Sequence, residues 1–314
     1  MIKKAIFLFP GQGAQYPGMG LDLIEASAAA RKVFDTASEV LNMDMAALIR
    51  DSDAETLKRT DVSQIAISAV SLAAAAFLGE KGITPAACAG FSLGEYPALR
   101  GAGVISVEDC FLLVNARGKA MRAAIDRLKS SSSDIGMAAV VGLEPAKVEA
   151  LIVEMKNSGL KDIYAANINS SKQIVVSGTI NEEVENRFKE AGAKRVIRLQ
   201  VAGPFHSPFM KEAADAFAPV LDKTRFNDPA IPVFSNVTGK QIQSGVEAKA
   251  LALRQIVESV RWTCEQAAFS AVKAEALLEV GPGKVLQGLW KDTGSEIPCF
   301  SAGAAVEIEL LAKE

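Results

Sequence analysis

The sequence predicts an α/β fold, in which a hydrolase-like core with a parallel sheet carries an inserted ferredoxin-like subdomain. Three observations predict it. Short apolar runs that end in glycine-rich turns alternate with helical patterns up to residue 129. A β-α-β-β-α-β pattern follows, and the α/β alternation resumes near residue 202. We therefore predict a large domain made of residues 1–129 and 202–314, and an inserted domain made of residues 130–201.

The first part of the chain is expected to supply strands and helices of the core. Residues 5–9 and 86–91 are short apolar runs and are predicted to be buried strands. Helical periodicity is found at about residues 20–50, 61–80 and 107–128. The apolar stretch at residues 65–78 is too short to span a bilayer, so we expect a buried helix there.

The middle of the chain has a different pattern. Four consecutive serines at residues 130–133 are typical of a linker. Strands are predicted at residues 137–143, 163–168, 173–177 and 195–201, and helices at residues 145–157 and 181–191. Pro145 is suited to a first helical turn and Asn181 to a helix cap. Beyond the insert, residues 233–236 and 276–280 are the predicted strands.

The composition excludes several classes of protein. Of 314 residues, 49% are hydrophobic and 23% are charged, and the net charge is −3, so a nucleic-acid binder is not expected. The cysteines Cys88, Cys110, Cys264 and Cys299 form no CxxC pair, which favours reduced thiols. The first apolar run is too short for a signal peptide. We expect a cytoplasmic protein that does not bind membranes.

Residues 90–94, Gly-Phe-Ser-Leu-Gly, match the GxSxG pattern of a nucleophilic serine. An apolar strand precedes the motif and a segment compatible with a helix follows it. In such a turn the serine hydroxyl is exposed, and the helix N-terminus helps to stabilise an oxyanion. Because GxSxG is common, an ordinary serine in a glycine-rich turn is the alternative. The context favours Ser92 as a nucleophile.

A serine hydroxyl needs a base to take its proton, and His206 is the only histidine of the chain. It lies in a proline-flanked loop at residues 203–208, where the core resumes after the insert. A single histidine also excludes zinc sites with two or three histidines, and we expect no metal.

Two further glycine-rich turns follow predicted strands. Residues 11–13, Gly-Gln-Gly, lack the third glycine of a dinucleotide fingerprint, since Tyr16 stands there, and no P-loop motif follows. A backbone N–H that faces an oxyanion remains an option for this turn. The turn at residues 281–283 is either structural or functional.

These motifs together carry a family resemblance. They occur at residues 9–15, 90–96, 117–121, 166–170, 203–207 and 279–283, with Gln255 and Trp262 between the last two. In this order, and over nearly the whole chain, they resemble the malonyl-CoA:acyl-carrier-protein transacylases of fatty-acid synthesis and the related acyltransferase domains of polyketide synthases.

The resemblance implies roles for individual residues. Ser92 would form a malonyl ester, and His206 would act as general base and then as general acid. The backbone N–H groups of Gln12 and Leu93 would form the oxyanion hole. The backbone carbonyl of Gln255 would orient the histidine.

The resemblance also implies a substrate pocket. Arg117 would pair with the free carboxylate of the malonyl group, for which a planar guanidinium is well suited. Met121 lies in the same motif as Arg117, and the bulk of Phe205 should disfavour a 2-methyl branch. One position departs from the family, because Phe91 stands where a histidine is usual before the nucleophile.

The implied reaction is ping-pong. Malonyl-CoA acylates Ser92, and the phosphopantetheine thiol of an acyl-carrier protein then takes the malonyl group, with no metal or redox cofactor. We expect a monomer. Acidic carrier proteins would dock on basic residues, and two clusters are candidates: Arg117, Lys119, Arg122, Arg127 and Lys129 on one helix, and Lys194, Arg195 and Arg198 in the insert.

Three rival functions remain open from the sequence. A serine esterase or thioesterase fits GxSxG equally well, and would place an acid such as Asp109, Asp126 or Asp162 behind the histidine. A polyketide acyltransferase would use another extender unit. A catalytically silent docking module is disfavoured, because the nucleophile, base and arginine are all present.

Overall fold

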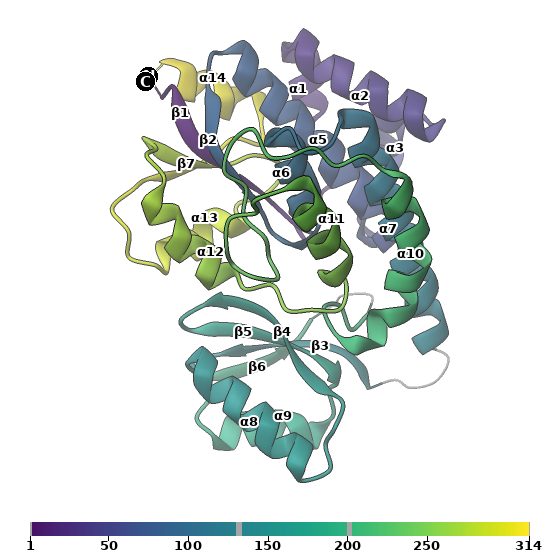
Figure 1. Cartoon of the computed structure of the whole chain (residues 1–314), viewed down its shortest axis with the longest axis vertical. Helices are drawn as coiled ribbons and strands as arrows, with labels where there is room; N and C mark the ends of the chain where they lie inside the picture. Colours follow the sequence, from purple (N-terminus) through teal and green to yellow (C-terminus); the bar gives the residue numbers. More distant parts are fainter. Residues whose placement is uncertain (1, 130–133, 200–202, 314) are drawn as a thin grey trace.

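A computed structural model describes residues 2–129, 134–199 and 203–313 of the chain. Within these residues the strands form two sheets, which Figure 1 shows one above the other. The larger sheet is parallel with the order β2-β1-β7-β8, and its strands are β1 (Lys4–Phe9), β2 (Thr84–Gly90), β7 (Ala276–Glu279) and β8 (Cys299–Ser301).

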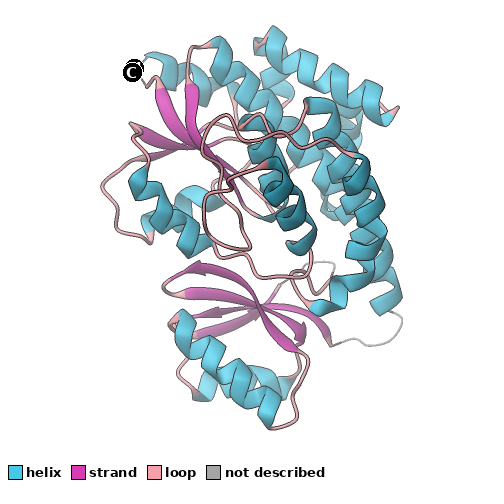
Figure 2. Ribbon diagram, in the orientation of Figure 1, coloured by secondary structure: helices cyan, strands magenta, loops and turns pink. Residues whose placement is uncertain are grey.

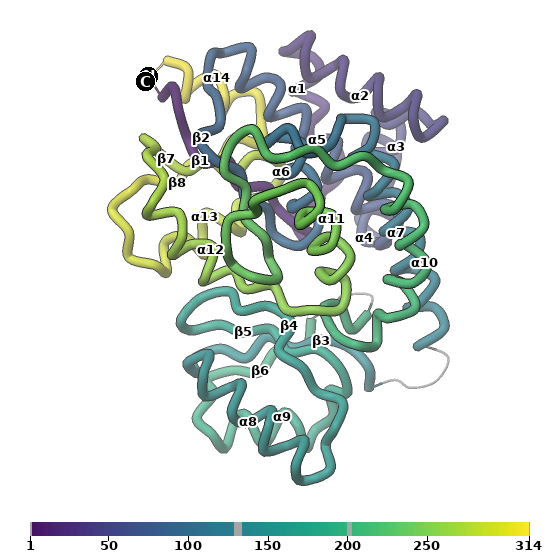
Figure 3. The backbone as a smooth tube through the Cα atoms, viewed as in Figure 1, coloured from purple at the N-terminus to yellow at the C-terminus, as the bar shows by residue number. Residues whose placement is uncertain are grey.

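The central strand β1 is buried on both faces. Phe7 and Phe9 point into one apolar cluster, while Ile6 and Leu8 point into another on the opposite face. This burial explains the uninterrupted apolar run in the sequence, because a central parallel strand has no solvent face. The two predicted strands at residues 5–9 and 86–91 are confirmed as β1 and β2. Figure 3 shows that β7, from late in the chain, lies beside β1.

Helices surround this sheet. They are α1 (Leu21–Ala26), α2 (Ala28–Leu41), α3 (Met45–Asp51), α4 (Ala54–Lys58), α5 (Thr60–Glu80), α6 (Glu95–Gly101), α7 (Val107–Lys129), α10 (Lys211–Lys223), α11 (Gly245–Arg254), α12 (Trp262–Ala268), α13 (Val285–Lys291) and α14 (Ala305–Lys313). The predicted helical region at residues 20–50 is divided into α1, α2 and α3. The breaks have local causes, since Ser27 caps α2, Asn42 ends it in a left-handed conformation, and Asp44 caps α3.

Helix α5 is the core helix of the large domain. Among the described residues it alone is long and apolar enough to cross a membrane, yet 83% of its apolar window is buried inside the molecule. It packs against α2 and α7, and its alanines and serines allow these helices to approach closely. The prediction of a buried helix at residues 65–78 is confirmed.

The inserted unit is ferredoxin-like, as predicted. Its elements are β3 (Ile135–Val141), α8 (Pro145–Asn157), β4 (Ile163–Ser170), β5 (Gln173–Thr179), α9 (Glu182–Glu190) and β6 (Arg195–Arg198). The sheet is antiparallel with the order β4-β5-β3-β6. Figure 2 shows α8 and α9 on the face that points away from the larger sheet. The unit has an apolar cluster of its own, and Asn181 caps α9 through the N–H of Val184.

Some predicted elements were wrong or are not described. Residues 233–236 do not form a strand, because Val233 makes an isolated bridge to Cys88 and Phe234 turns to pair with Gln241. Strand β8 was not predicted, since its half-buried residues carry no clear periodicity. The serine run at 130–133 and residues 200–201 lie outside the described residues, and the domain boundaries at 130 and 202 stay a prediction.

Candidate active site

Ser92 lies in a tight turn at the end of β2. It begins a short 3-10 helix, Ser92–Gly94, that continues into α6. Its φ is 52°, in the left-handed region that side chains other than glycine rarely adopt. Both flanking glycines are required, because a Cβ on Gly90 would overlap the carbonyl of Gly94 and a Cβ on Gly94 would overlap that of Phe9. The turn therefore has the geometry of a nucleophile elbow.

His206 is placed directly opposite this serine. Ser92 Oγ lies 2.8 Å from His206 Nε2. On the other side of the ring, Nδ1 lies 2.8 Å from the carbonyl oxygen of Gln255 and 3.2 Å from that of Glu258. A carbonyl can only accept, so Nδ1 carries the hydrogen and Nε2 is left to accept the serine proton.

The histidine is kept neutral by its surroundings. Burial, followed by the positive charge of Arg117, lowers the pKa of His206 to about 4. A neutral imidazole is the form that acts as a base, so the site has a competent base at neutral pH.

Two of the three acids that a hydrolase could place behind this histidine are engaged elsewhere. Asp109 accepts a hydrogen bond from the hydroxyl of Ser106, and Asp126 accepts one from Arg122. The partners of His206 Nδ1 are backbone carbonyls, as the family resemblance implied for Gln255.

The side chain of Arg117 extends from α7 toward Ser92. Its side chain is 1% exposed, and it donates to Gln64 Oε1 and Gln255 Oε1, each at 2.9 Å. Its Nη2 also lies 3.4 Å from Ser92 Oγ. Burial lowers the pKa of this guanidinium, a shift that the nearby Tyr96 and Glu95 oppose. Gln64, Gln255 and Ser92 are neutral partners, and the Nε has no partner among the described residues. An anionic ligand would satisfy this buried cation.

A cavity of about 270 Å³ connects these groups. Seven of the eight predicted site residues line it: Gln12, Ser92, Leu93, Arg117, Met121, Phe205 and His206. Gln255 lies behind them, where its side chain contacts Arg117 and the backbone of Ser92. The opposite wall comes from the inserted sheet, through Met137, Ala139, Asn167, Asn169, Gln173 and Val175. The cavity therefore lies between the two sheets.

Phe91, the one position at which the sequence departs from the pattern of the resemblance, also lines the cavity. Its ring packs edge-on against Trp262 with 5.5 Å between the ring centroids. The apolar side chain is thus held by an apolar partner, and it adds no titratable group beside Ser92.

The sequence reasoning missed several polar residues around the site. Gln64 holds Arg117, and Asn236 holds the backbone of Ser92. Glu95 and Glu265 are buried carboxyl groups behind the elbow. Glu95 follows the GxSxG motif directly, but no local signal distinguishes the other three from ordinary surface residues.

Comparisons with known proteins agree with this geometry. The model of the acyl transferase domain family matches residues 6–309. A malonyl CoA-acyl carrier protein transacylase of Bacillus subtilis is 37% identical over 98% of this chain and 96% of its own length. The protein of the same name from Escherichia coli K12 is 38% identical over 91% of each chain.

Solved structures give the same result. An acyl carrier protein S-malonyltransferase from Vibrio cholerae superposes with a TM-score of 0.89 at 36% identity, over 98% of this chain and 99% of its own. A malonyl-transacylase solved in complex with its type II PKS acyl-carrier protein also has a TM-score of 0.89, at 34% identity and 99% coverage of both chains.

Proposed function

Because this chain belongs to the acyl transferase domain family and to its malonyl CoA-acyl carrier protein transacylases, we propose that it transfers malonyl groups from malonyl-CoA to an acyl-carrier protein in fatty-acid synthesis. The observation that carries the proposal is the meeting of Ser92, His206 and Arg117 in one cavity. Ser92 and His206 provide the nucleophile and the base of acyl transfer. Arg117 provides a cation that would bind the carboxylate of the acyl group.

The reaction has two balanced halves. His206 Nε2 takes the proton of Ser92 while Oγ attacks the thioester carbon, and the N–H groups of Gln12 and Leu93 stabilise the oxyanion. The C–S bond breaks, and CoA leaves as its thiol with the proton that His206 took from Ser92. The phosphopantetheine thiol of the carrier then gives its proton to His206 and attacks the ester. Ser92 leaves with that proton, and the malonyl thioester is released.

The distance between Arg117 and Ser92 fits a short diacid. In a malonyl group one methylene separates the ester carbonyl from the free carboxylate, and the guanidinium lies 3.4 Å from Ser92 Oγ. Met121 and Phe205 form apolar walls beside this position. A 2-methyl branch would have to displace one of them, so we expect malonyl to be preferred over methylmalonyl.

The proposal also covers the carrier, the compartment and the oligomeric state. The protein acts as a cytoplasmic monomer on a carrier of fatty-acid synthesis. A polyketide carrier is the second candidate, because a similar malonyl-transacylase was solved with a type II PKS carrier. Comparison of purified carriers of both kinds as acceptors distinguishes the two.

The test of the proposed function is a two-step labelling experiment. Protein incubated with malonyl-CoA that is radiolabelled in the malonyl group should retain the label through denaturation, and the label should map to the peptide with Ser92. Addition of carrier bearing phosphopantetheine should move the label to the carrier. Release of free malonate without transfer would instead indicate a thioesterase.

Arg117→Ala should change the choice of acyl group. Loss of a charge-assisted pair in a buried site should lower kcat/KM for malonyl-CoA by about 100-fold, while acetyl-CoA should be used as well as before or better. The measurement is the rate of Ser92 acylation by each donor. Arg50→Ala removes an exposed arginine and is the control. An equal loss of acylation rate with both donors would contradict the role of Arg117 in binding the malonyl carboxylate.

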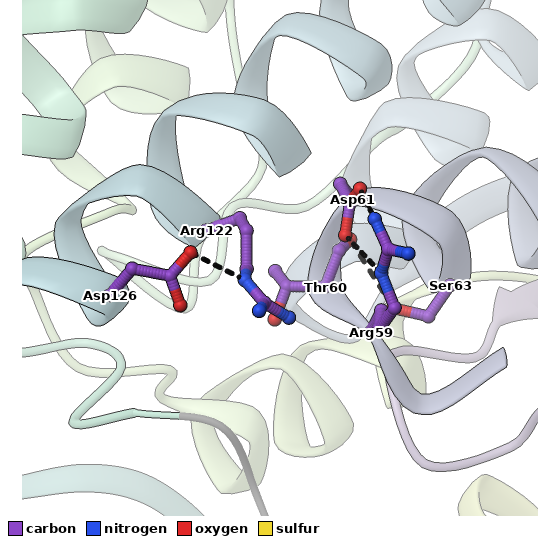
Figure 4. A network of polar contacts seen from close by, with 6 residues as sticks. All are labelled: Arg59, Thr60, Asp61, Ser63, Arg122 and Asp126. Carbon is purple, nitrogen blue, oxygen red and sulfur yellow. Dashed lines mark hydrogen bonds and ion pairs between the residues drawn. The ribbon is translucent and has the colours of Figure 1, made fainter. Parts of the chain in front are cut away.

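Of the basic residues named on α7, Arg117 is buried and so does not belong to a docking surface, whereas Lys119 and Arg122 allow a test of carrier docking. Figure 4 shows Arg122 bonded to Asp126 and, nearby, Arg59 bonded to Asp61, so part of the basic charge is already paired. The Arg122–Asp126 distance is 2.8 Å. Lys119→Glu with Arg122→Glu should raise KM for the carrier by about 10-fold at low salt and leave acylation by malonyl-CoA unchanged. The same double reversal at Arg31 and Lys32 of α2 is the control. An unchanged KM would place the docking surface elsewhere.

A further inference from the structure

The side-chain amide of Asn236 bonds to the backbone of the nucleophile elbow at Ser92 and at Gly90. Asn236 is fully buried in the turn that follows the Val233 bridge. Its Oδ1 accepts the N–H of Ser92 at 2.7 Å, and its Nδ2 donates to the carbonyl of Gly90 at 2.6 Å. The two bonds hold the backbone at Ser92 itself and two residues before it. They oppose relaxation of Ser92 out of its left-handed conformation, which is strained for a residue other than glycine.

Two buried carboxyl groups hold the amide. Glu265 Oε1 accepts from Asn236 Nδ2 at 2.8 Å, and Glu95 Oε2 accepts the backbone N–H of Asn236 at 2.9 Å. Burial raises the pKa of Glu95 to about 7 and that of Glu265 well above its usual range, where the neighbouring Glu95 adds to the effect. Two buried like charges cannot both ionise at low cost, so burial beside Glu95 favours the neutral form of Glu265, whose Oε1 accepts the hydrogen bond in either form.

The same network extends to the base. Gln255 Nε2 donates to the carbonyl of Ser92 at 2.8 Å and to Glu95 Oε2 at 3.0 Å, while the backbone carbonyl of Gln255 accepts from His206. The N–H of Ser92 is occupied by Asn236, which leaves the next N–H, that of Leu93, to face the oxyanion. Asn236 thus fixes the direction of Ser92 Oγ relative to groups that hold His206.

We propose that Asn236, held in place by Glu265, is a positioning residue that keeps Ser92 in the left-handed conformation in which Oγ points at His206. The inference deepens the proposed function, because it assumes that Ser92 is the nucleophile. It assigns Asn236 no contact with the substrate. Its loss should therefore slow acylation without weakening the binding of malonyl-CoA.

Asn236→Ala tests this directly. Misplacement of a nucleophile by about 1 Å can cost about 100-fold in rate, so we expect a loss of that size in the single-turnover acylation of Ser92. The KM for malonyl-CoA should stay within about threefold of the wild type. Val233→Ala removes a fully buried side chain three residues away that makes no bond to Ser92, and is the control for general destabilisation. Acylation within threefold of the wild type, or an equal loss in Val233→Ala, would overturn the proposal.

A pair of variants at Glu265 keeps the proposal testable if Asn236→Ala does not fold. Glu265→Gln keeps an oxygen acceptor for Asn236 Nδ2 and should acylate within about threefold of the wild type. Glu265→Leu removes the acceptor and should be about tenfold slower or more. Equal rates for the two variants would also overturn the proposal.

Labelling of Ser92 by a fluorophosphonate, run in parallel, separates the two proposals. This probe reports the reactivity of the serine without malonyl-CoA. If the wild type is labelled by the probe but not acylated by malonyl-CoA, the proposed function fails. The comparison of variants then still decides the role of Asn236 from the rate of labelling.

Discussion

Ser92→Ala is expected to abolish the malonyl-enzyme and, with it, all transfer to the carrier. Among the residues that the structure describes, Ser92 Oγ, 2.8 Å from His206 Nε2, is the one serine oxygen that bonds to the base. Alanine carries the same Cβ as serine and so meets the same strain at φ 52°, which means that the folded structure should be retained. Intact-mass spectrometry after incubation with malonyl-CoA should show no added malonyl group.

Binding should survive this substitution. In Ser92→Ala, Arg117 loses only its 3.4 Å contact with Ser92 Oγ and keeps its bonds to Gln64 and Gln255, so calorimetry should still detect the binding of malonyl-CoA. Ser270→Ala, at an exposed serine, is the control and should be acylated as the wild type is. A malonyl group found on another side chain of Ser92→Ala, such as the exposed thiol of Cys264, would contradict the assignment of the nucleophile.

The chemistry of the site could be predicted because its signals are local. GxSxG specifies a strand, a tight turn and a helix within a few residues, and the structure has all three. The base could be named because the chain has one histidine. The ferredoxin-like unit was predictable for the same reason, since its periodicities, the proline in the first turn of α8 and the Asn181 cap of α9 are short-range features.

The supporting network could not be predicted, because its contacts join distant parts of the chain. Asn236 is 144 residues from Ser92, and Gln64 is 53 residues from Arg117. Neither has a neighbour in sequence that indicates its partner. The strand predicted at residues 233–236 was wrong for a related reason. Its apolar residues do pack beside β2, but the chain turns at Phe234 and brings Asn236 back under the elbow.

His206→Ala is expected to slow the acylation of Ser92 by about 1,000-fold or more, because in the described part of the chain no other base bonds to Oγ. The oxyanion donors and Arg117 remain, so the KM for malonyl-CoA should change little. The measurement is single-turnover acylation in a quenched-flow instrument. A rate close to the wild type would show that a different base acts at this site.

The dependence of this rate on pH identifies the base further. The neutral imidazole is the active form, so acylation should be constant near neutral pH and fall only as the pH approaches the lowered pKa of His206, about 4. The charge of Arg117 is the second cause of that shift. In Arg117→Ala the pKa of His206 should therefore rise, and the fall in acylation rate on the acid side of the pH profile, the acid limb, should move to higher pH. If the limb instead lies near pH 7 and disappears in Glu95→Gln, the titrating group is Glu95, whose pKa burial raises to about 7. In that case the protonation of the network behind the elbow, rather than that of the imidazole, would limit the reaction.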